Sequence, residues 1–95
     1  MSSGPEDTRA FRITGRVQGV GFRWWTQRTA TDLRIAGTVR NAADGSVEVV
    51  ASGQPEDLSR FTDALRRGPP GAEVETVKPT VPPDRVAGDA FEIVR

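Results

Sequence analysis

A glycine-rich segment early in the chain has the residue types that bind a phosphate group. Residues Gly15 to Gly21 include three glycines, and the helix expected after them carries Arg23 in its first turn. Backbone N–H groups of a glycine-permitted turn can converge on an anion, and the start of a helix adds free N–H groups and a positive dipole end. The planar fork of Arg23 can hold two phosphate oxygens together. The candidate phosphate-binding residues are Gly15, Arg16, Val17, Gln18, Gly19, Val20, Gly21 and Arg23.

The same residues also fit a simpler interpretation, in which the glycines only let a strand turn into a helix and Arg23 is a solvated surface charge. General phosphate motifs do not separate the two interpretations. The segment lacks the Gly-Lys-Ser/Thr of a Walker loop, and Gly19-Val20-Gly21 leads to Trp24 where a dinucleotide fingerprint has glycine. Taken alone, the glycine-rich segment therefore leaves both readings open.

Asn41 is the second candidate for chemistry. Alternation from Ile35 to Val39 predicts a strand, and Asn41 falls on the same side of it, the side expected to face the helices and the glycine-rich segment. Asn41 also fits as the residue that enters the tight turn from Ala42 to Gly45. Asp44 is assigned to that Asp-Gly turn and not to catalysis.

The composition excludes much of enzyme chemistry. The chain has no His and no Cys, so it lacks imidazole bases, thiolate nucleophiles and the usual zinc ligands. We expect no metal and no cofactor. Thirteen Lys and Arg balance thirteen Asp and Glu, so no overall field draws the chain toward nucleic acid or an anionic membrane. Any anion site must be local.

Hydrophobic periodicity predicts the elements that position these residues. Strands are predicted over residues 9–14, 35–40, 47–51, 74–77 and 91–94. Apolar steps of three and four predict a helix over 22–33, with Trp24 and Trp25 as packing or partly exposed residues outside the site. A second helix is predicted to begin at Pro55 and to stop before Gly68.

The order strand, helix, strand, strand, helix, strand predicts an α+β fold, the ferredoxin-like split βαβ arrangement, with two helices on one face of an antiparallel sheet. In a βαβ unit both strands run in the same direction, so their ends lie at one edge. This places the segment from Gly15 to Gly21 beside Asn41. RNA-binding domains share the order but need aromatic residues on the open face. The outward positions here are Arg12, Thr14, Glu48 and Val50.

Length and composition predict one domain. The chain has 95 residues, of which 36% are hydrophobic, which suits a single compact core. We expect a domain over residues 8–95, preceded by a flexible extension over 1–7. No apolar run approaches the roughly 18 residues of a membrane span, and the first residues lack a signal pattern. We therefore expect a cytoplasmic monomer without membrane contact.

Two segments resemble the acylphosphatase family. The first, GRVQGVGFR from Gly15 to Arg23, is similar to that family's glycine-rich loop, which ends in Phe-Arg. The second, from Gly37 to Glu48, resembles the strand and hairpin that contain the family's other catalytic residue. Gly68-Pro69 agrees as well. The resemblance extends from about Arg9 to the end of the chain.

The resemblance implies the ferredoxin-like fold and the hydrolysis of a small acyl phosphate to a carboxylate and inorganic phosphate. It implies that Arg23 binds the phosphate, that the loop over 16–20 supplies backbone amides and that Asn41 orients the attacking water. The leaving carboxylate has a conjugate acid with a pKa near ~4, so no general acid is needed. These contacts leave the acyl part unspecified, and we expect broad specificity and no nucleic-acid partner.

Three positions differ from residues usual in the family. Arg34 stands where a glycine commonly ends the first helix, Thr38 where Trp is usual and Arg95 where Tyr often closes the chain. Thr38 is expected on the open sheet face, and Arg34 is expected to strain the helix exit if its φ is positive. The alternative function is a non-catalytic relative that binds phosphorylated ligands, which the presence of both Arg23 and Asn41 disfavours.

Overall fold

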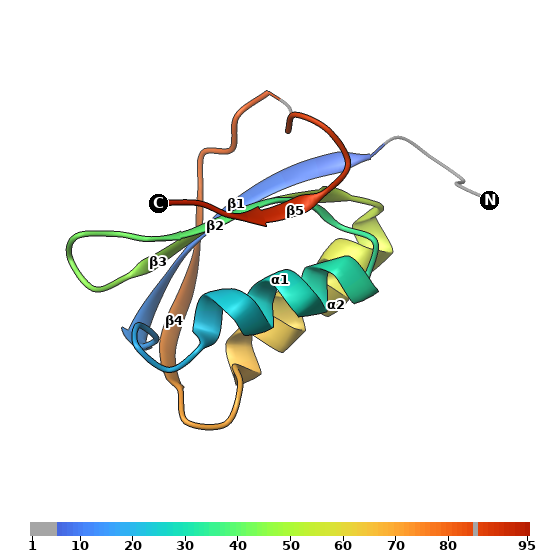
Figure 1. Ribbon diagram of the computed structural model, residues 1–95. Coiled ribbons are helices and arrows are strands. Elements are labelled where there is room, and N and C mark those ends of the chain that lie inside the picture. Colours follow the sequence, from blue (N-terminus) through green and yellow to red (C-terminus); the bar gives the residue numbers. More distant parts are fainter. Residues whose placement is uncertain (1–5, 85) are drawn as a thin grey trace.

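Strands and helices follow one another in the predicted order. A computed structural model describes residues 6–84 and 86–95 (Figure 1). The strands are β1 (Asp7–Arg16), β2 (Ala36–Asn41), β3 (Val47–Gly53), β4 (Glu73–Thr80) and β5 (Phe91–Ile93). The helices are α1 (Phe22–Asp32) and α2 (Pro55–Arg67). Of the extension predicted over 1–7, residues 1–5 lie outside the described ranges, and Asp7 already belongs to β1.

The sheet has the strand order β4-β1-β3-β2-β5. β1 pairs antiparallel with β3 and β4, and β2 pairs antiparallel with β3, which confirms the ferredoxin-like arrangement. β5 joins the outer edge of β2 in parallel, with Val39 opposite Ile93, so the whole sheet is mixed. β1 and β2 run in the same direction on either side of β3, and the connections that follow them lie at the same end of the sheet (Figure 1).

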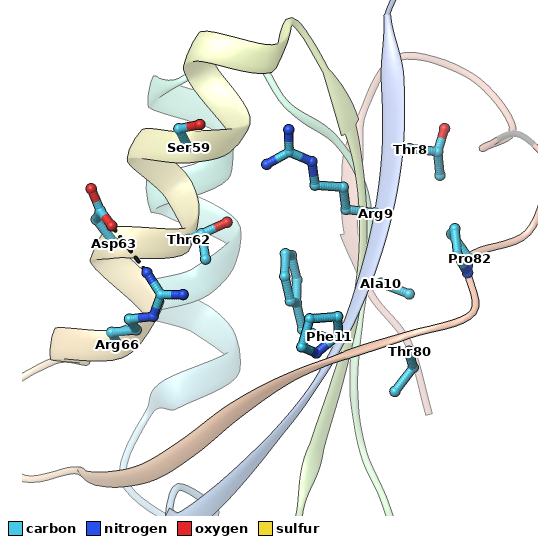
Figure 2. A pocket seen from close by; sticks show the side chains of 11 residues that line it. Thr8, Arg9, Ala10, Phe11, Ser59, Thr62, Asp63, Arg66, Thr80 and Pro82 are labelled. Carbon is cyan, nitrogen blue, oxygen red and sulfur yellow. Dashed lines mark hydrogen bonds and ion pairs between the residues drawn. The ribbon is translucent and has the colours of Figure 1, made fainter.

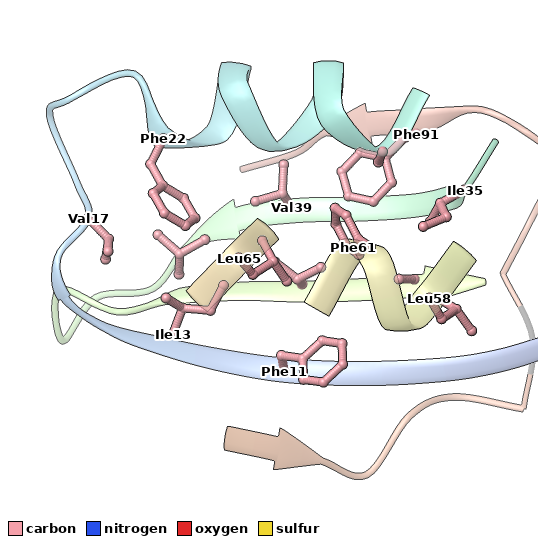
Figure 3. Packing of buried hydrophobic residues seen from close by; sticks show 14 residues of the cluster. Phe11, Ile13, Val17, Phe22, Ile35, Val39, Leu58, Phe61, Leu65 and Phe91 are labelled. Carbon is pink, nitrogen blue, oxygen red and sulfur yellow. The ribbon is translucent and has the colours of Figure 1, made fainter. Parts of the chain in front are cut away.

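Both helices cover one face of the sheet, and the core lies between them and the strands (Figure 3). Side chains alternate along β1, β2 and β3, so about every second residue of these strands enters this core. Ile13, Val39 and Val49 do so and are at most 1% exposed. On α2 the buried face repeats at helical spacing. It consists mainly of Leu58, Phe61 and Leu65.

The ends of α2 match the signals read from its sequence. Pro55 occupies the first turn, and Gly68 follows the last residue with a φ of 67°, a conformation that glycine adopts without strain. α1 has 11 residues and α2 has 13. In the described ranges, no helix is long and apolar enough to cross a membrane.

The open face of the sheet carries charged and polar residues at outward positions predicted from the sequence. Arg12 and Glu48 lie there, opposite each other in the β1–β3 ladder, and Arg12 forms an ion pair with Asp44 while Arg40 forms one with Glu48. Thr38 lies between two buried residues of β2 and so faces the same side. The predicted outward residues include no ring on which a base could stack, and this argues against an RNA-binding module.

Arg34 ends the first helix in a left-handed conformation. Its φ is 60°, and among the described residues it is the only non-glycine with a positive φ. The Ile35 N–H donates to the Ala30 carbonyl at 2.9 Å, which closes the helix end and requires this turn of the backbone. The positive φ on which the expected strain depends is therefore present at this position.

Replacing Arg34 by glycine should stabilise the fold. A left-handed conformation costs a non-glycine residue about 1–2 kcal/mol, which glycine avoids. Glycine also makes the unfolded chain more flexible, and this offsets part of the stabilisation. We expect Arg34→Gly to raise the free energy of unfolding by about 0.5–1 kcal/mol in urea titrations. Arg60→Gly, in the middle of α2, is the control and should lower it by about 1 kcal/mol. A loss of stability in Arg34→Gly would contradict the explanation.

Candidate active site

The loop between β1 and α1 turns through two left-handed glycines. Gly19 and Gly21 both have a φ of 76°, and Gly21 is the N-cap of α1 without any side-chain cap. A Cβ built on either residue would have nothing within 4 Å. Glycine is therefore required for the backbone conformation and not for lack of space, and the loop leaves open room above its backbone.

The backbone N–H groups of this loop have no backbone acceptor among the described residues. For residues 17 to 24 the structure records no backbone acceptor within its described ranges, and the first bond of the helix runs from the Trp25 N–H to the Gly21 carbonyl at 3.0 Å. The early N–H groups of any helix lack intrahelical partners. Here the loop adds further free donors next to them, at the positive end of the helix dipole.

Arg23 and Asn41 come together at one pocket of about 200 Å³. They lie far apart in the sequence and reach it from α1 and from the end of β2. The meeting of the β1 and β2 ends predicted from the βαβ geometry is therefore confirmed. The pocket is lined by Val17, Gly19, Gly21, Phe22, Arg23, Trp24, Asn41 and Ile93.

Asn41 lines this pocket and carries a buried acceptor without a partner among the described residues. Its Oδ1 is shielded from solvent and has no hydrogen-bond partner among the described residues. A buried polar atom left without a partner costs about 1–3 kcal/mol. Asn41 also lines the pocket, so a turn of its carboxamide is needed before this shielded oxygen can accept from a donor there, such as a water molecule. Figure 3 shows Val17 and Phe22, both 1% exposed, closing the core behind the loop.

Gln18 ties the loop to the hairpin that follows Asn41. Its Nε2 donates to the Ala42 carbonyl at 2.8 Å and to the Ser46 carbonyl at 2.9 Å. Asp44 stabilises the same hairpin, because its Oδ1 accepts from the Ser46 N–H at 3.0 Å and from the Ser46 hydroxyl at 2.6 Å. This agrees with the assignment of Asp44 to the turn. Gln18 thus holds the two halves of the site in register.

The other predicted loop residues lie behind or beside the pocket. Val20 packs against the core. Arg16 is exposed and forms an ion pair with Glu73 at 3.2 Å. Gly15 has a φ of 120°, and a Cβ there would stand 2.1 Å from the Glu73 carbonyl oxygen. These residues shape the base of the loop, so of the predicted side chains only Arg23 and Asn41 bring polar groups to the pocket wall.

Trp24 and Ile93 line the pocket although the sequence analysis leaves them outside the site. Trp25 packs on Phe22 with ring centroids 5.5 Å apart, whereas Trp24 is 59% exposed. The sequence does indicate the exposed position of Trp24. Trp24 lies two residues after the buried Phe22, and this spacing places the two side chains on nearly opposite faces of the helix. The sequence gives no such indication for Ile93, because its position at the pocket results from the parallel pairing of β5 with β2.

A larger cavity, of about 500 Å³, lies at the other end of β1. Figure 2 shows Arg9 and Phe11 extending from β1 toward α2, where Asp63 and Arg66 form an ion pair at 3.3 Å. None of the predicted site residues lines it. Within residues 6–84 and 86–95 no three His, Cys, Asp or Glu side chains form a cluster able to hold a metal ion. The smaller pocket is the candidate active site.

Comparisons with known proteins show the family to which the chain belongs. The family profile described as Acylphosphatase matches residues 9–93. An acylphosphatase of Listeria monocytogenes is 50% identical over 75% of this chain and 77% of its own length, and one of Rhizobium etli is 49% identical over 85% of each. The crystal structure of acylphosphatase from Bacillus subtilis superposes with a TM-score of 0.86 at 35% identity, covering 93% of this chain and 98% of that one. An acylphosphatase structure from Coxiella burnetii gives 0.82 at 33% identity, over 94% and 93%. The chain belongs to the acylphosphatase family.

Proposed function

We propose that this acylphosphatase hydrolyses its substrate in the pocket between the β1–α1 loop and the end of β2, with Arg23 and Asn41 as its catalytic residues. The observation that carries the proposal is that a single pocket of about 200 Å³ is lined by glycines of the loop with its unpaired backbone donors, by Arg23 and by Asn41, which carries an unpaired acceptor. An acyl phosphate needs all three, since it brings an anionic phosphate and reacts with water.

The loop and Arg23 bind the phosphate. The N–H groups of residues 17 to 24 have no recorded backbone acceptor among the described residues, and the dipole of α1 favours a negative charge at the same place. No carboxylate among the described residues forms an ion pair with Arg23. Its guanidinium is therefore free to hold two phosphate oxygens and to neutralise the charge that spreads over them during transfer.

Asn41 positions the attacking water. For this the carboxamide of Asn41 turns, so that its Oδ1, which is shielded and unpaired among the described residues, accepts a hydrogen bond from that water. A neutral carboxamide has no useful pKa, so Asn41 orients the water and does not remove its proton. The new bond joins the water oxygen to phosphorus. The proton passes to a phosphate oxygen, and the products are inorganic phosphate and a carboxylate.

The leaving group needs no help from an acid. The bond between phosphorus and the acyl oxygen breaks, and its electron pair leaves on a carboxylate, a weak base. The residues that line the pocket include no carboxylate, and the chain has no His or Cys. Positioning and charge stabilisation supply the rate enhancement, which suits the small covalent demands of phosphoryl transfer.

The proposed enzyme acts as a monomer on a small acyl phosphate. One chain supplies both Arg23 and Asn41 to one pocket, so a second copy is not needed to complete the site. The proposed location is the cytoplasm, because the chain has none of the cysteines that stabilise many small secreted domains.

The test of the proposed function is hydrolysis of benzoyl phosphate by the purified chain in excess chelator. We expect turnover that the chelator does not change, because no proposed step uses a metal. Release of inorganic phosphate and loss of the acyl-phosphate absorbance measure it independently. No turnover at high enzyme concentration would refute the proposal and favour the non-catalytic, phosphate-binding alternative.

A further inference from the structure

Two exposed apolar side chains line the candidate active site. Among the described residues the large hydrophobic side chains that are exposed are Trp24 at 59%, Ile93 at 37% and Val81 at 93%. Val81 lies in the connection after β4, whereas Trp24 and Ile93 both line the candidate active site. They come from the first turn of α1 and from β5, so two separate elements bring apolar surface to one place.

The indole of Trp24 is held in position on the helix surface. The guanidinium carbon of Arg28, one helical turn later, lies 5.3 Å from the centroid of the ring, within the range of a cation–π interaction. Ile93 is held by the sheet, because the Val94 N–H donates to the Val39 carbonyl at 2.9 Å. Trp24 is therefore restrained by a contact of its ring, and Ile93 through the backbone next to it.

Resting on the proposed function, we infer that Trp24 and Ile93 form an acyl subsite that selects acyl phosphates with an aromatic or extended apolar acyl group. The phosphate occupies the free N–H groups and Arg23, which are polar. The acyl group of the same molecule must then leave this cradle across the remaining wall of the pocket. Trp24 and Ile93 provide that wall, and burying their exposed apolar surface against an apolar acyl group is favourable. The substrate specificity is then narrower than the broad specificity for acyl groups expected from the sequence.

Binding of two phosphonates tests the subsite without any turnover. Methylphosphonate and benzylphosphonate carry similar anionic heads and differ in the apolar group. By calorimetry we expect the wild-type chain to bind benzylphosphonate about three- to tenfold more tightly, the range expected for an aromatic contact. Trp24→Ala should lose this preference, Trp24→Phe should keep most of it, and Val81→Ala, a matched exposed apolar residue away from the pocket, should bind like wild type.

Turnover of acetyl phosphate and benzoyl phosphate tests the same subsite in catalysis. In Trp24→Ala the kcat/KM for benzoyl phosphate should fall about three- to tenfold relative to that for acetyl phosphate, mainly through KM. Comparing the variant with wild type cancels the different intrinsic reactivities of the two substrates. Equal losses for both substrates, or a phosphonate preference that survives Trp24→Ala, would overturn the subsite.

The outcomes also separate the subsite from the proposed function. If wild type hydrolyses both acyl phosphates but binds the two phosphonates alike, the proposed function stands and the acyl subsite fails. If wild type prefers benzylphosphonate through Trp24 but hydrolyses neither acyl phosphate, the apolar subsite stands and the proposed function fails.

Discussion

Arg23→Ala should lower kcat/KM for benzoyl phosphate by about 10²- to 10³-fold, the usual result of removing one preorganised donor to a developing charge. The loss is expected in both binding and turnover, because the guanidinium contacts the phosphate before and during transfer. Arg23→Lys should recover only part of it, since a lysine keeps the charge and loses the planar fork that holds two oxygens at once. Steady-state kinetics would measure the loss in turnover, and calorimetry of inorganic phosphate binding would measure the loss in affinity.

Arg60→Ala is the matched control for this prediction. Arg60 is an exposed arginine on α2 whose ion pair with Asp57, at 3.6 Å, lies on the helix surface, and it is absent from the candidate active site. Its removal should leave kcat/KM unchanged. If Arg23→Ala hydrolyses benzoyl phosphate at the wild-type rate while folding normally, the solvated-charge interpretation of Arg23 is correct and the proposed site is wrong.

Asn41→Ala should separate phosphate binding from turnover. The loop donors and Arg23 remain, so the affinity for inorganic phosphate should stay close to that of wild type. The attacking water loses its partner, so kcat should fall by about 10²- to 10³-fold. Asn41→Asp should lose both phosphate affinity and turnover, because a carboxylate beside the bound phosphate repels it.

Asn41→Ala should not lower the stability of the fold. The Asn41 Oδ1 is buried and unpaired among the described residues, so alanine removes an unsatisfied acceptor and no recorded hydrogen bond. We expect the thermal midpoint of Asn41→Ala to equal or exceed that of wild type. Thr38→Ala, on the open face of the same strand, is the control for turnover. Wild-type kcat in Asn41→Ala, or loss of phosphate affinity together with kcat, would contradict the assigned role.

Local patterns in the sequence predict the fold and both polar groups of the site. Alternation along β1, β2 and β3 and the capping signals of α2 are local properties, and the structure confirms them. Asn41 follows from topology, since the ends of two strands that run in the same direction must lie together. The glycine-rich loop alone stays ambiguous, because glycines permit a sharp turn whether or not an anion is bound.

Long-range contacts account for what the sequence does not predict. The parallel addition of β5 to β2 brings Ile93 to the pocket, and a three-residue strand carries no signal of its partner or direction. The two bonds from Gln18 to the hairpin depend on carbonyls exposed by a turn elsewhere in the chain. Trp24 differs, because its exposed position follows from helical spacing and only its neighbours at the pocket are unpredictable.

The Gln18 bridge has a consequence for how activity is gained during folding. The bridge joins two connections that touch only after β3 has been inserted between β1 and β2. A chain that has formed its helices and a single hairpin thus has every reactive group but no assembled centre. The rate at which hydrolysis recovers after dilution from denaturant would then report the rate at which β1, β3 and β2 pair. Circular dichroism of the helices does not report this step.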